Sequence, residues 1–346
     1  MVDTGNDAAF DSDALRDWSA RVFAAAGMPV SDAETAADLL VRTSLRGIDT
    51  HGISRLPLYV ESLLEGRINP RPDHGGEMRD GILHYRGDHG LGQAVGVAAV
   101  KAALELAKDR AVVPCLAKQC GHLAALGSYV LLAAEAGMIG FICQSTTPLM
   151  ALEGWTDRAI GNNPLAFGTP LENSAPLVFD MSSSVVARGN LRDAVREKRN
   201  LPAGWAIGPD GKPTTDAETG FAGAVLPVGG YKGIGIAMMV QVLAGSLLGN
   251  STNLGPDSTS SNEMGAFLLI INPALVNDAY AADVDVWLSR YRKVAGAQGR
   301  YPGQRAAASE VSRRRTGIPV PPVSLQHLRA IGNRVGQPFS LEVKTA

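Results

Sequence analysis

The chain has 346 residues, a length typical of about two domains. Its 32 Lys and Arg residues against 34 Asp and Glu residues give a formal net charge of −2 at pH 7. A chain so close to neutral has no overall field to attract nucleic acid or an anionic membrane surface. Hydrophobic residues make up 45% of the sequence, which excludes a disordered chain.

The cysteines and the N-terminal segment both favour a cytoplasmic protein. Cys115, Cys120 and Cys143 are odd in number and form no Cys-x-x-Cys pair, which argues against a disulfide framework or a zinc site. The first residues are acidic and lack the apolar core of a secretory signal. The six histidines show no metal-ligand spacing, so we predict no metal site.

Helical patterns open the chain. Apolar spacing predicts a helix over residues 13–26, and Ser31-Asp32-Ala33-Glu34 is typical of a capping box that begins a second helix. A turn-rich stretch, RGIDTHG, leads to a third helical segment over residues 54–64. Gly66 and two prolines then end this first module.

Strands and helices alternate in the middle of the chain, which predicts an α/β layer architecture. The expected strands cover residues 82–86, 112–117, 139–143, 165–167, 177–181 and 266–271. The expected helices cover residues 93–110, 124–136 and 284–292, with a last one at 324–335.

Three further stretches are expected to differ from this alternation. Residues 233–249 are apolar enough to approach a membrane span, but they are the only such stretch, so we expect a buried helix of an α/β core. Residues 201–227 are rich in Gly, Pro, Asp and Thr, and we expect a structured loop. Residues 309–322, with three consecutive arginines and several prolines, are expected to form a linker.

The standard catalytic motifs are missing, among them the G-x-G-x-x-G dinucleotide fingerprint, the P-loop, H-E-x-x-H and G-x-S-x-G. Instead, polar residues lie in glycine-rich clusters. In RGIDTHGISRLPLY, His51 precedes Arg55 by four residues, so on a helix both side chains project to one side. An imidazole beside a guanidinium suits a general acid/base next to a carboxylate clamp. A structural histidine beside a surface arginine is the alternative.

Three other clusters have the same character. His122 in CGHLAALG precedes a predicted helix, where the helix dipole favours the neutral imidazole, and a capping histidine is the alternative. Asp180 in FDMSSS follows an apolar strand and could orient a histidine, bind a ribose and phosphate with the serines, or simply form a turn. Lys232 in LPVGGYKGIG precedes an apolar helix, which suits either an anion site or a solvated loop charge.

Taken together and in this order, the clusters resemble the type 2 malate/L-lactate dehydrogenase family. The matching blocks extend over about residues 15–335, nearly the whole chain, and are RGIDTHGISRLPLYVESLLEGRINPRP, GLGQ, GHLAALGSY, GNNPLAFGTP, FDMSSSVVARGN, LPAGW, GKPTTD, LPVGGYKGIGIAMMV and Tyr301-Pro302-Gly303. The resemblance implies a nicotinamide-binding α/β fold that is not a Rossmann fold, with a mixed β-sheet. It also implies a helical module of residues 1–75 with 308–346, an α/β cofactor- and substrate-binding domain of residues 76–307, and a homodimer.

The activity that this resemblance implies is hydride transfer between NAD or NADP and C2 of a small 2-oxo acid or 2-hydroxy acid, as in malate or lactate. The alternative within the family is an NADPH-dependent reductase of a cyclic imino acid such as piperideine- or pyrroline-2-carboxylate. A nucleotide-binding homologue without catalysis is a further hypothesis, which the intact His51 and Arg55 argue against. A phosphoryl-transfer or hydrolytic enzyme using the Lys232 loop lacks the Walker and triad elements.

The resemblance also implies roles for single residues. His51 becomes the proton donor, in a relay with Thr50 and Asp180, and His122 is the second candidate for the same role. Arg55 becomes the partner of the substrate carboxylate, with Tyr59 one turn further along the same wall. The nucleotide is expected to contact Ser145, Asp180, Met181, Ser182, Lys232, Gly299, Arg300 and Tyr301.

Some positions depart from the family pattern. Thr50 and Asn190 stand where serine and lysine are usual, Gln241 stands where glutamate is frequent, and Met-Ser-Ser-Ser replaces Met-Ala-Thr-Ser after Asp180. These departures leave open the substrate and the choice between NAD and NADP.

Overall fold

A computed structural model describes residues 7–249 and 264–344. Its centre is a seven-stranded mixed sheet in the order β2-β3-β4-β11-β5-β6-β7. Only β3 and β4 pair in parallel among these neighbours, and the other five pairs are antiparallel. The mixed α/β fold expected from the sequence is therefore confirmed. The strands are β2 (Gly75–Arg79), β3 (Ile82–Arg86), β4 (Val112–Lys118), β5 (Ile139–Gln144), β6 (Leu165–Thr169), β7 (Leu177–Met181) and β11 (Ala266–Ile271).

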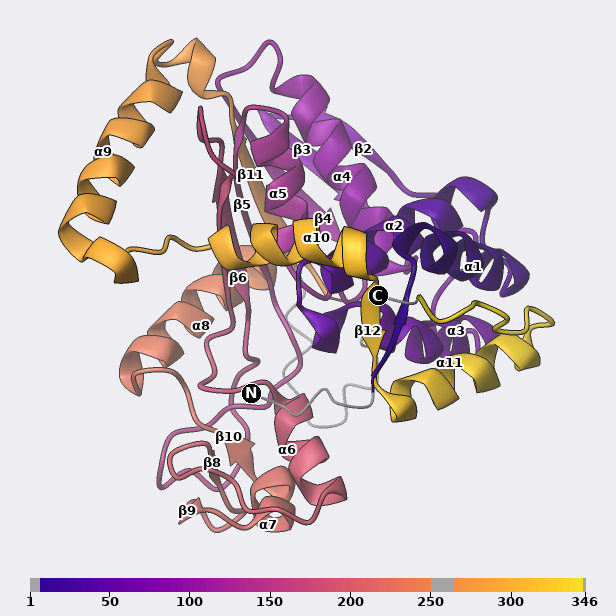
Figure 1. The fold of residues 1–346 in the computed structure, drawn as a ribbon. Helices are drawn as coiled ribbons and strands as arrows, with labels where there is room; N and C mark the ends of the chain where they lie inside the picture. The colour runs from indigo at the N-terminus through magenta and orange to yellow at the C-terminus, as the bar shows by residue number, and fades with distance from the viewer. Residues whose placement is uncertain (1–6, 250–263, 345–346) are drawn as a thin grey trace.

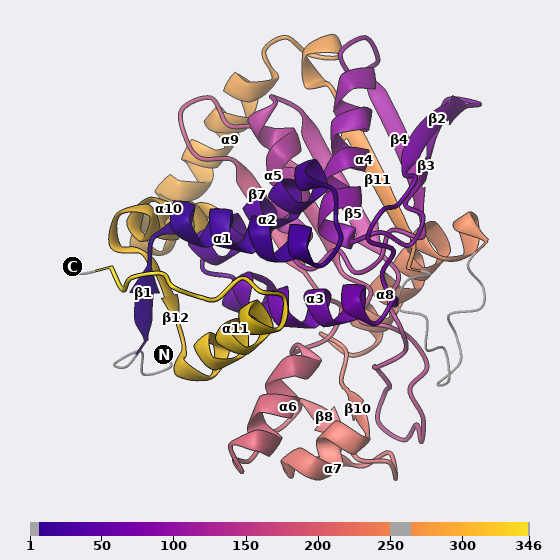
Figure 2. The same ribbon diagram turned by 90° about the vertical axis from the view of Figure 1, so that its right-hand side faces the viewer.

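Helices cover both faces of this sheet (Figures 1 and 2). Because successive side chains of a strand point to opposite faces, Ile142 of β5 joins the core under α4 (Gly92–Leu106) and α5 (Gly127–Glu135). Its neighbour Cys143 joins the core under α8 (Tyr231–Ala244). The alternation expected of a sheet buried on both sides is thus carried by adjacent residues.

The strand directions bring four chain segments to one edge of the sheet. β11 runs antiparallel to both β4 and β5, and β6 runs antiparallel to both β5 and β7. Consequently β3, β4, β5 and β7 all run the same way, and the segments that follow them meet at their carboxyl ends. Ligands of α/β sheets usually bind at such an edge. Three of these segments carry His122, Ser145 and Ser182.

The helices at the two chain ends form a second core. α1 (Ser12–Ala25), α2 (Val30–Leu45), α3 (Leu56–Leu64) and α11 (Pro322–Arg334) pack together, and β1 (Ala8–Phe10) pairs antiparallel with β12 (Ile318–Val320). Figure 2 shows α1, α3, α11, β1 and β12 together on this side of the molecule. Leu91 and Ala94, at the start of α4, belong to the same core. The division into residues 1–75 with 308–346 and residues 76–307 stays a prediction.

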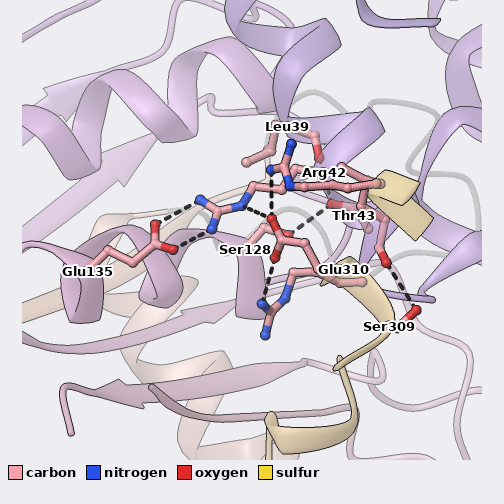
Figure 3. Close-up of polar contacts among 10 residues, drawn as sticks. Leu39, Arg42, Thr43, Ser128, Glu135, Ser309 and Glu310 are labelled. Carbon is pink, nitrogen blue, oxygen red and sulfur yellow. Dashed lines mark hydrogen bonds and ion pairs between the residues drawn. The ribbon is translucent and has the colours of Figure 1, made fainter. Parts of the chain in front are cut away.

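The expected linker at residues 309–322 is wrong, because most of it is helical. α10 (Gln304–Thr316) crosses the molecule to reach α2 (Figure 1), and beyond its end the chain forms β12 and begins α11. Glu310 of α10 accepts hydrogen bonds from Arg42 (3.2 Å) and Arg46 (3.1 Å), and Arg42 also pairs with Glu135 of α5 (Figure 3). These ion pairs fix a segment whose charge and prolines alone suggested an extended connection.

Two other expectations need correction. Residues 201–227 form the short strands β8 (Ala206–Ile207), β9 (Pro213–Thr214) and β10 (Ala224–Val225) with α7 (Ala217–Ala222), which pack with α6 (Arg188–Arg196) into a small lobe. Strands of two residues are too short to show an alternating hydrophobic pattern in the sequence. The second helix begins at Val30 after Pro29 without a side-chain cap, so Ser31 lies inside its first turn and the capping box is not formed.

One helix in the described part of the chain, Tyr231–Leu248, has the length and apolar composition of a membrane span. It comprises α8 and the short 3₁₀ helix η3 (Ser246–Leu248). One face packs on the sheet through Val240 and Ala244, whereas Met238 and Val242 on the other face are exposed. The burial expected for this helix is therefore present on one side only. The last helix of the α/β part, α9 (Tyr280–Ala295), extends away from the body of the molecule (Figure 1).

Candidate active site

His51 and Arg55 lie in a tight connection between α2 and α3. Two 3₁₀ helices, η1 (Asp49–His51) and η2 (Ile53–Arg55), meet at Gly52. A Cβ at Gly52 would clash with Ser44 Oγ, which accepts a hydrogen bond from the Ile53 N–H (2.9 Å). Glycine is therefore required for this connection to approach α2 closely. The break means that one continuous helix does not align the two side chains.

A hydrogen bond from the Arg55 side chain to the backbone of Thr50 brings Arg55 close to His51 instead. The Arg55 Nε–H donates to the carbonyl oxygen of Thr50 (2.7 Å), and Thr50 Oγ1 lies 2.9 Å from His51 Nδ1. Burial, helped by the nearby Arg55 charge, lowers the pKa of His51 to about 4. The imidazole is thus neutral at pH 7 in the free protein.

His122 lies in the segment that follows β4, and a buried glutamine at the end of β5 fixes that segment. Gln144 accepts from the Leu123 N–H (3.0 Å) and donates to the Gly121 carbonyl oxygen (2.8 Å). The centroids of the His122 and His51 rings are 6.2 Å apart. Burial, with smaller effects of His51 and Arg55, lowers the pKa of His122 to about 3. Both candidate histidines therefore share one corner of the molecule.

Tyr59 completes this corner, together with a residue that sequence reasoning did not single out. The Tyr59 hydroxyl lies 3.0 Å from His122 Nδ1 and accepts from Gln93 Nε2 (3.2 Å). Burial raises the pKa of Tyr59 to about 12. Gln93 is the last residue of the GLGQ block, and Gln144 lies outside all of the family blocks. No local pattern marks either glutamine, because their partners are distant in sequence.

Asp180 has a different partner from the one that the predicted relay requires. Its carboxylate accepts from the Gly127 N–H (2.7 Å) at the start of α5, where the helix dipole favours a negative charge. Removal of the carboxyl from water raises the pKa of Asp180 to about 6, although the residue is exposed on one side. Among the described residues, no hydrogen bond joins Asp180 to Thr50 or His51. The relay through Asp180 therefore stays a prediction.

Several of the residues expected at the nucleotide come together where β7 ends. Met181 and Ser182 lead into Ser183, whose carbonyl oxygen accepts from the Val228 N–H (2.8 Å) and packs against Gly233. This contact places the first turn of α8, with the exposed Lys232, beside the serines. The Ser182 hydroxyl lies 3.0 Å from that of Ser184.

The other expected nucleotide residues lie along β7 and behind α8. The Pro302 carbonyl oxygen accepts from the Val178 N–H of β7 (3.0 Å), and the Tyr301 hydroxyl donates to the Ala175 carbonyl oxygen (2.8 Å). The segment from Gly299 to Tyr301, with exposed Arg300, therefore runs beside that strand. Ser145 is buried, and its hydroxyl donates to the Ala244 carbonyl oxygen of α8 (3.0 Å).

The chemistry of this edge fits the phosphates of a nicotinamide dinucleotide. Lys232 and Arg300 are exposed, and neither forms an ion pair with any residue of the described ranges 7–249 and 264–344. Lys232 also stands in the first turn of a helix, where the dipole favours anions. Across the same ranges, no group of three or more His, Cys, Asp or Glu side chains could hold a metal ion.

Comparison with known proteins gives the class of this chain. The family model described as malate/L-lactate dehydrogenase matches residues 10–329. A malate dehydrogenase of Pyrococcus horikoshii is 33% identical over 346 residues, covering 94% of each chain. A Δ1-pyrroline-2-carboxylate reductase of Ancylobacter novellus is 30% identical over 320 residues, covering 90% of this chain and 93% of that one.

A solved structure agrees with these relatives. The sulfolactate dehydrogenase of Methanocaldococcus jannaschii superposes with a TM-score of 0.85 and 29% identity, covering 95% of this chain and 98% of that one. Fold and relatives together define an NAD(P)-dependent oxidoreductase. The chain belongs to the malate/L-lactate dehydrogenase family, as its sequence blocks predicted.

Proposed function

We propose that this oxidoreductase interconverts a small 2-oxo acid and the corresponding 2-hydroxy acid of the malate or lactate type, with NAD or NADP as hydride carrier. The observation that carries the proposal is the convergence of two neutral imidazoles, 6.2 Å apart, beside the Arg55 guanidinium. The malate and sulfolactate dehydrogenases among the relatives support the substrate class. The bound nicotinamide would supply the hydride to C2 of the substrate.

Arg55 is the proposed partner of the substrate carboxylate. Its Nε–H is committed to Thr50, whereas the remaining guanidinium N–H groups can form a bidentate pair with a carboxylate. A bound carboxylate would offset the positive charge that helps to keep the pKa of His51 low. Substrate binding should therefore favour the protonated His51, which then donates its proton to the oxygen on C2. Tyr59 would act next to Arg55, through its hydrogen bond with His122.

The nucleotide is proposed to lie along the carboxyl ends of the strands. Lys232 and Arg300 would pair with its phosphates, because both cations are exposed and lack an ion pair among the described residues. Met181, Ser182 and Asp180 would contact the ribose and nicotinamide parts. Gly299 and Tyr301 would shape the same edge, and Ser145 would contribute through its backbone carbonyl oxygen, because its hydroxyl and its N–H are both hydrogen-bonded within the protein.

A reductase of a cyclic imino acid is the alternative, and the pyrroline-2-carboxylate reductase among the relatives favours it. Such a substrate carries the same carboxylate next to the carbon that receives the hydride, so Arg55 would bind it in the same way. The proton would then go to the ring nitrogen or stay with the histidine, according to the charge of the imine.

A substrate panel separates these activities. Purified protein is mixed with NADH and, separately, NADPH, and with pyruvate, oxaloacetate, sulfopyruvate, piperideine-2-carboxylate or pyrroline-2-carboxylate, while the absorbance of the reduced nicotinamide is followed. We expect turnover with at least one 2-oxo acid, and its loss in a His51→Ala variant that still binds cofactor. Folded protein that binds cofactor but turns over nothing on the panel would instead indicate a nucleotide-binding protein without catalysis.

We also propose that the protein is a homodimer in the cytoplasm. Large apolar side chains are exposed on α8 (Met238, Val242) and on the projecting α9 (Val286, Trp287, Val294), which favours a protein partner on this side. A second copy of the chain is the simplest such partner. Light scattering on the eluted protein should give twice the chain mass, and Trp287→Glu should lower it towards one chain. The three free, buried cysteines are in keeping with a reducing compartment.

A further inference from the structure

The side-chain amide of Gln93 can be oriented in only one way. Gln93 is fully buried on α4, and one end of its amide lies 3.1 Å from the His122 carbonyl oxygen and 3.2 Å from the Tyr59 hydroxyl. A carbonyl oxygen only accepts hydrogen bonds, so the NH₂ group, and not the amide oxygen, must face it. The NH₂ group has two hydrogens, one for each of these partners.

The direction of the next hydrogen bond follows. Because the Tyr59 oxygen accepts from Gln93, its own hydrogen is free to point at His122 Nδ1, which lies 3.0 Å away. A ring nitrogen that accepts a hydrogen bond carries no proton, and a neutral imidazole then carries its proton on Nε2. Gln93 and Tyr59 together thus select one tautomer of His122.

We propose that Gln93 and Tyr59 are positioning residues that hold His122 as a neutral Nε2–H donor to the substrate oxygen on C2, and that His51 alone exchanges the proton. This inference rests on the proposed function and assigns different tasks to the two histidines. The Nε2–H of His122 would stabilise negative charge that develops on that oxygen as hydride reaches C2.

The surroundings of His51 differ in the way that this division requires. Thr50 Oγ1, at 2.9 Å from His51 Nδ1, can donate to the neutral ring and, after rotation of the hydroxyl, accept from the charged one. Thr50 is also exposed, so a proton can reach this pair from water. Protonation of His122 at Nδ1 would instead remove the acceptor of the Tyr59 hydroxyl, and this hydroxyl would need a new acceptor in a buried site.

The groups that face His122 also disfavour its charged form. His51 and Arg55 lie on the connection between α2 and α3, Tyr59 on α3 and Gln93 on α4, and none of them carries a negative charge at neutral pH. Gln93 Oε1 is buried and has no hydrogen-bond partner among the described residues. A side chain that leaves one polar atom unpaired in a core is costly. Since this cost is borne in the structure, the hydrogen bonds that the Gln93 NH₂ group donates to Tyr59 and to the His122 backbone are what hold the side chain in this orientation.

The test is ¹⁵N NMR of the histidine rings in protein labelled with ¹⁵N-histidine, without substrate, with His122 assigned by its loss in His122→Asn. Wild-type protein should show His122 as the Nε2–H tautomer, with no titration between about pH 5 and 8, where a histidine ordinarily changes charge. Tyr59→Phe should give a mixture of tautomers and lower kcat by about 10-fold or more. Gln93→Leu should weaken the tautomer preference in the same direction.

Tyr85→Phe is the matched control. Tyr85 is also buried, and its hydroxyl also lies against a histidine Nδ1, that of His74 at 2.8 Å. This variant should change only the His74 signals and leave kcat as it is in wild type. It therefore separates the loss of a Tyr–His hydrogen bond in general from the loss of the one at the site.

The outcomes keep this inference apart from the proposed reaction. A wild-type His122 that titrates near neutral pH, or that carries its proton on Nδ1, overturns the inference even if the enzyme turns over 2-oxo acids. An unchanged tautomer in Tyr59→Phe overturns the role of Tyr59. If Tyr59→Phe mixes the tautomers of His122 but leaves kcat unaltered, the part of His122 in catalysis is overturned. Silence on the substrate panel contradicts the proposed function and leaves the tautomer measurement intact.

Discussion

Two regions of this molecule are built in different ways. The reaction corner comprises His51, Arg55, Tyr59 and His122 with their hydrogen-bond partners, and the nucleotide edge comprises the residues expected at the cofactor, such as Lys232 and Arg300. In the reaction corner, Thr50 pairs with His51, and the Gln93 NH₂ group, Tyr59 and His122 are hydrogen-bonded to one another, although Gln93 Oε1 has no partner among the described residues. At the nucleotide edge, Lys232 and Arg300 are exposed and form no ion pair within the described residues. The first region is organised before any ligand arrives, and the second offers free charge.

This difference follows from what each region has to do. A proton donor and a carboxylate clamp must be placed accurately relative to one carbon atom, and internal hydrogen bonds supply that accuracy. Phosphates spread their charge over several oxygens, so a flexible lysine or arginine can meet them in more than one geometry. Substitutions in the reaction corner should therefore affect kcat, the pH dependence or the KM of the carboxylate substrate, whereas those at the nucleotide edge should affect cofactor affinity.

The largest effect is expected for His51→Ala. Loss of a positioned proton donor should lower kcat by at least about 10²-fold, with cofactor binding preserved, because the nucleotide edge is untouched. Steady-state kinetics and cofactor fluorescence measure the two quantities. His74→Ala, which removes a histidine bonded to Tyr85 away from the site, is the control and should behave like wild type. An unchanged kcat in His51→Ala would transfer the acid/base role to His122.

Arg55→Leu should raise KM for the carboxylate substrate by about 10- to 100-fold, from the loss of a charge-assisted pair. The KM for NAD(P)H should change little, since Arg55 belongs to the reaction corner and not to the nucleotide edge. The variant should also raise the pKa of His51, because the Arg55 charge helps to depress it. In the reduction direction, where His51 must carry the proton that it gives up, an alkaline limb of the pH–rate profile that moves to higher pH would show this second effect. An equal rise in both KM values would contradict the assignment.

The two histidines should make the folded protein less stable in acid. Their pKa values of about 4 and about 3 lie below the ordinary value of 6.5, so the unfolded chain binds more protons between about pH 4 and 6.5. The free energy of unfolding should decrease as the pH is lowered through this range, by up to about 1.4 kcal/mol per pH unit for each histidine. The raised pKa of Asp180 acts with the opposite sign.

The comparison of variants isolates the histidine contribution to that slope. Denaturant unfolding at several pH values should give a shallower dependence for His122→Asn than for wild type, and a shallower one still for the double variant with His51→Asn. Equal slopes in all three proteins would mean that neither histidine is held neutral by its surroundings.

Lys232→Ala tests the nucleotide edge. Loss of one exposed cation should raise KM for the cofactor by about 5- to 20-fold, because one charge-assisted contact is removed. The effect should shrink at high salt, since the interaction is screened. Lys212→Ala removes another exposed lysine, in the small lobe, and should leave KM unaltered. A fall in kcat with unchanged cofactor KM would place Lys232 in the reaction corner instead.

Much of the central sheet could be predicted from the sequence. Strands β7 and β11 begin and end at the predicted residues, because each is a short apolar run bounded by turn residues. Helix α10 was missed because it has no buried apolar stripe, Glu310 being its buried residue, and because its fixed position depends on the pairs of Glu310 with Arg42 and Arg46. Contacts between residues more than 260 positions apart leave no local signature.

The site divides along the same line. His51, Arg55 and His122 could be singled out because chemically active side chains stand among glycines in compact clusters. Gln93 and Gln144 could not, because a buried amide acts through the distant loop that it meets. The partner of Asp180 was also not predictable, since the start of α5 contacts it only once β7 has paired with β6 as the outermost strand of the sheet.

The smallest expected effect joins the missed helix to the reaction corner. Arg313 of α10 forms an ion pair with Asp49 (2.6 Å) at the start of η1 and also donates to the Ser44 carbonyl oxygen. Because Asp49 is partly exposed, Arg313→Ala should lower the free energy of unfolding by only about 1 kcal/mol. The connection that carries His51 should loosen, so kcat should fall more than cofactor binding does. Arg315→Ala, on an exposed position of the same helix, is the control. If both variants lose stability equally and keep wild-type kcat, α10 supports the fold but not the position of His51.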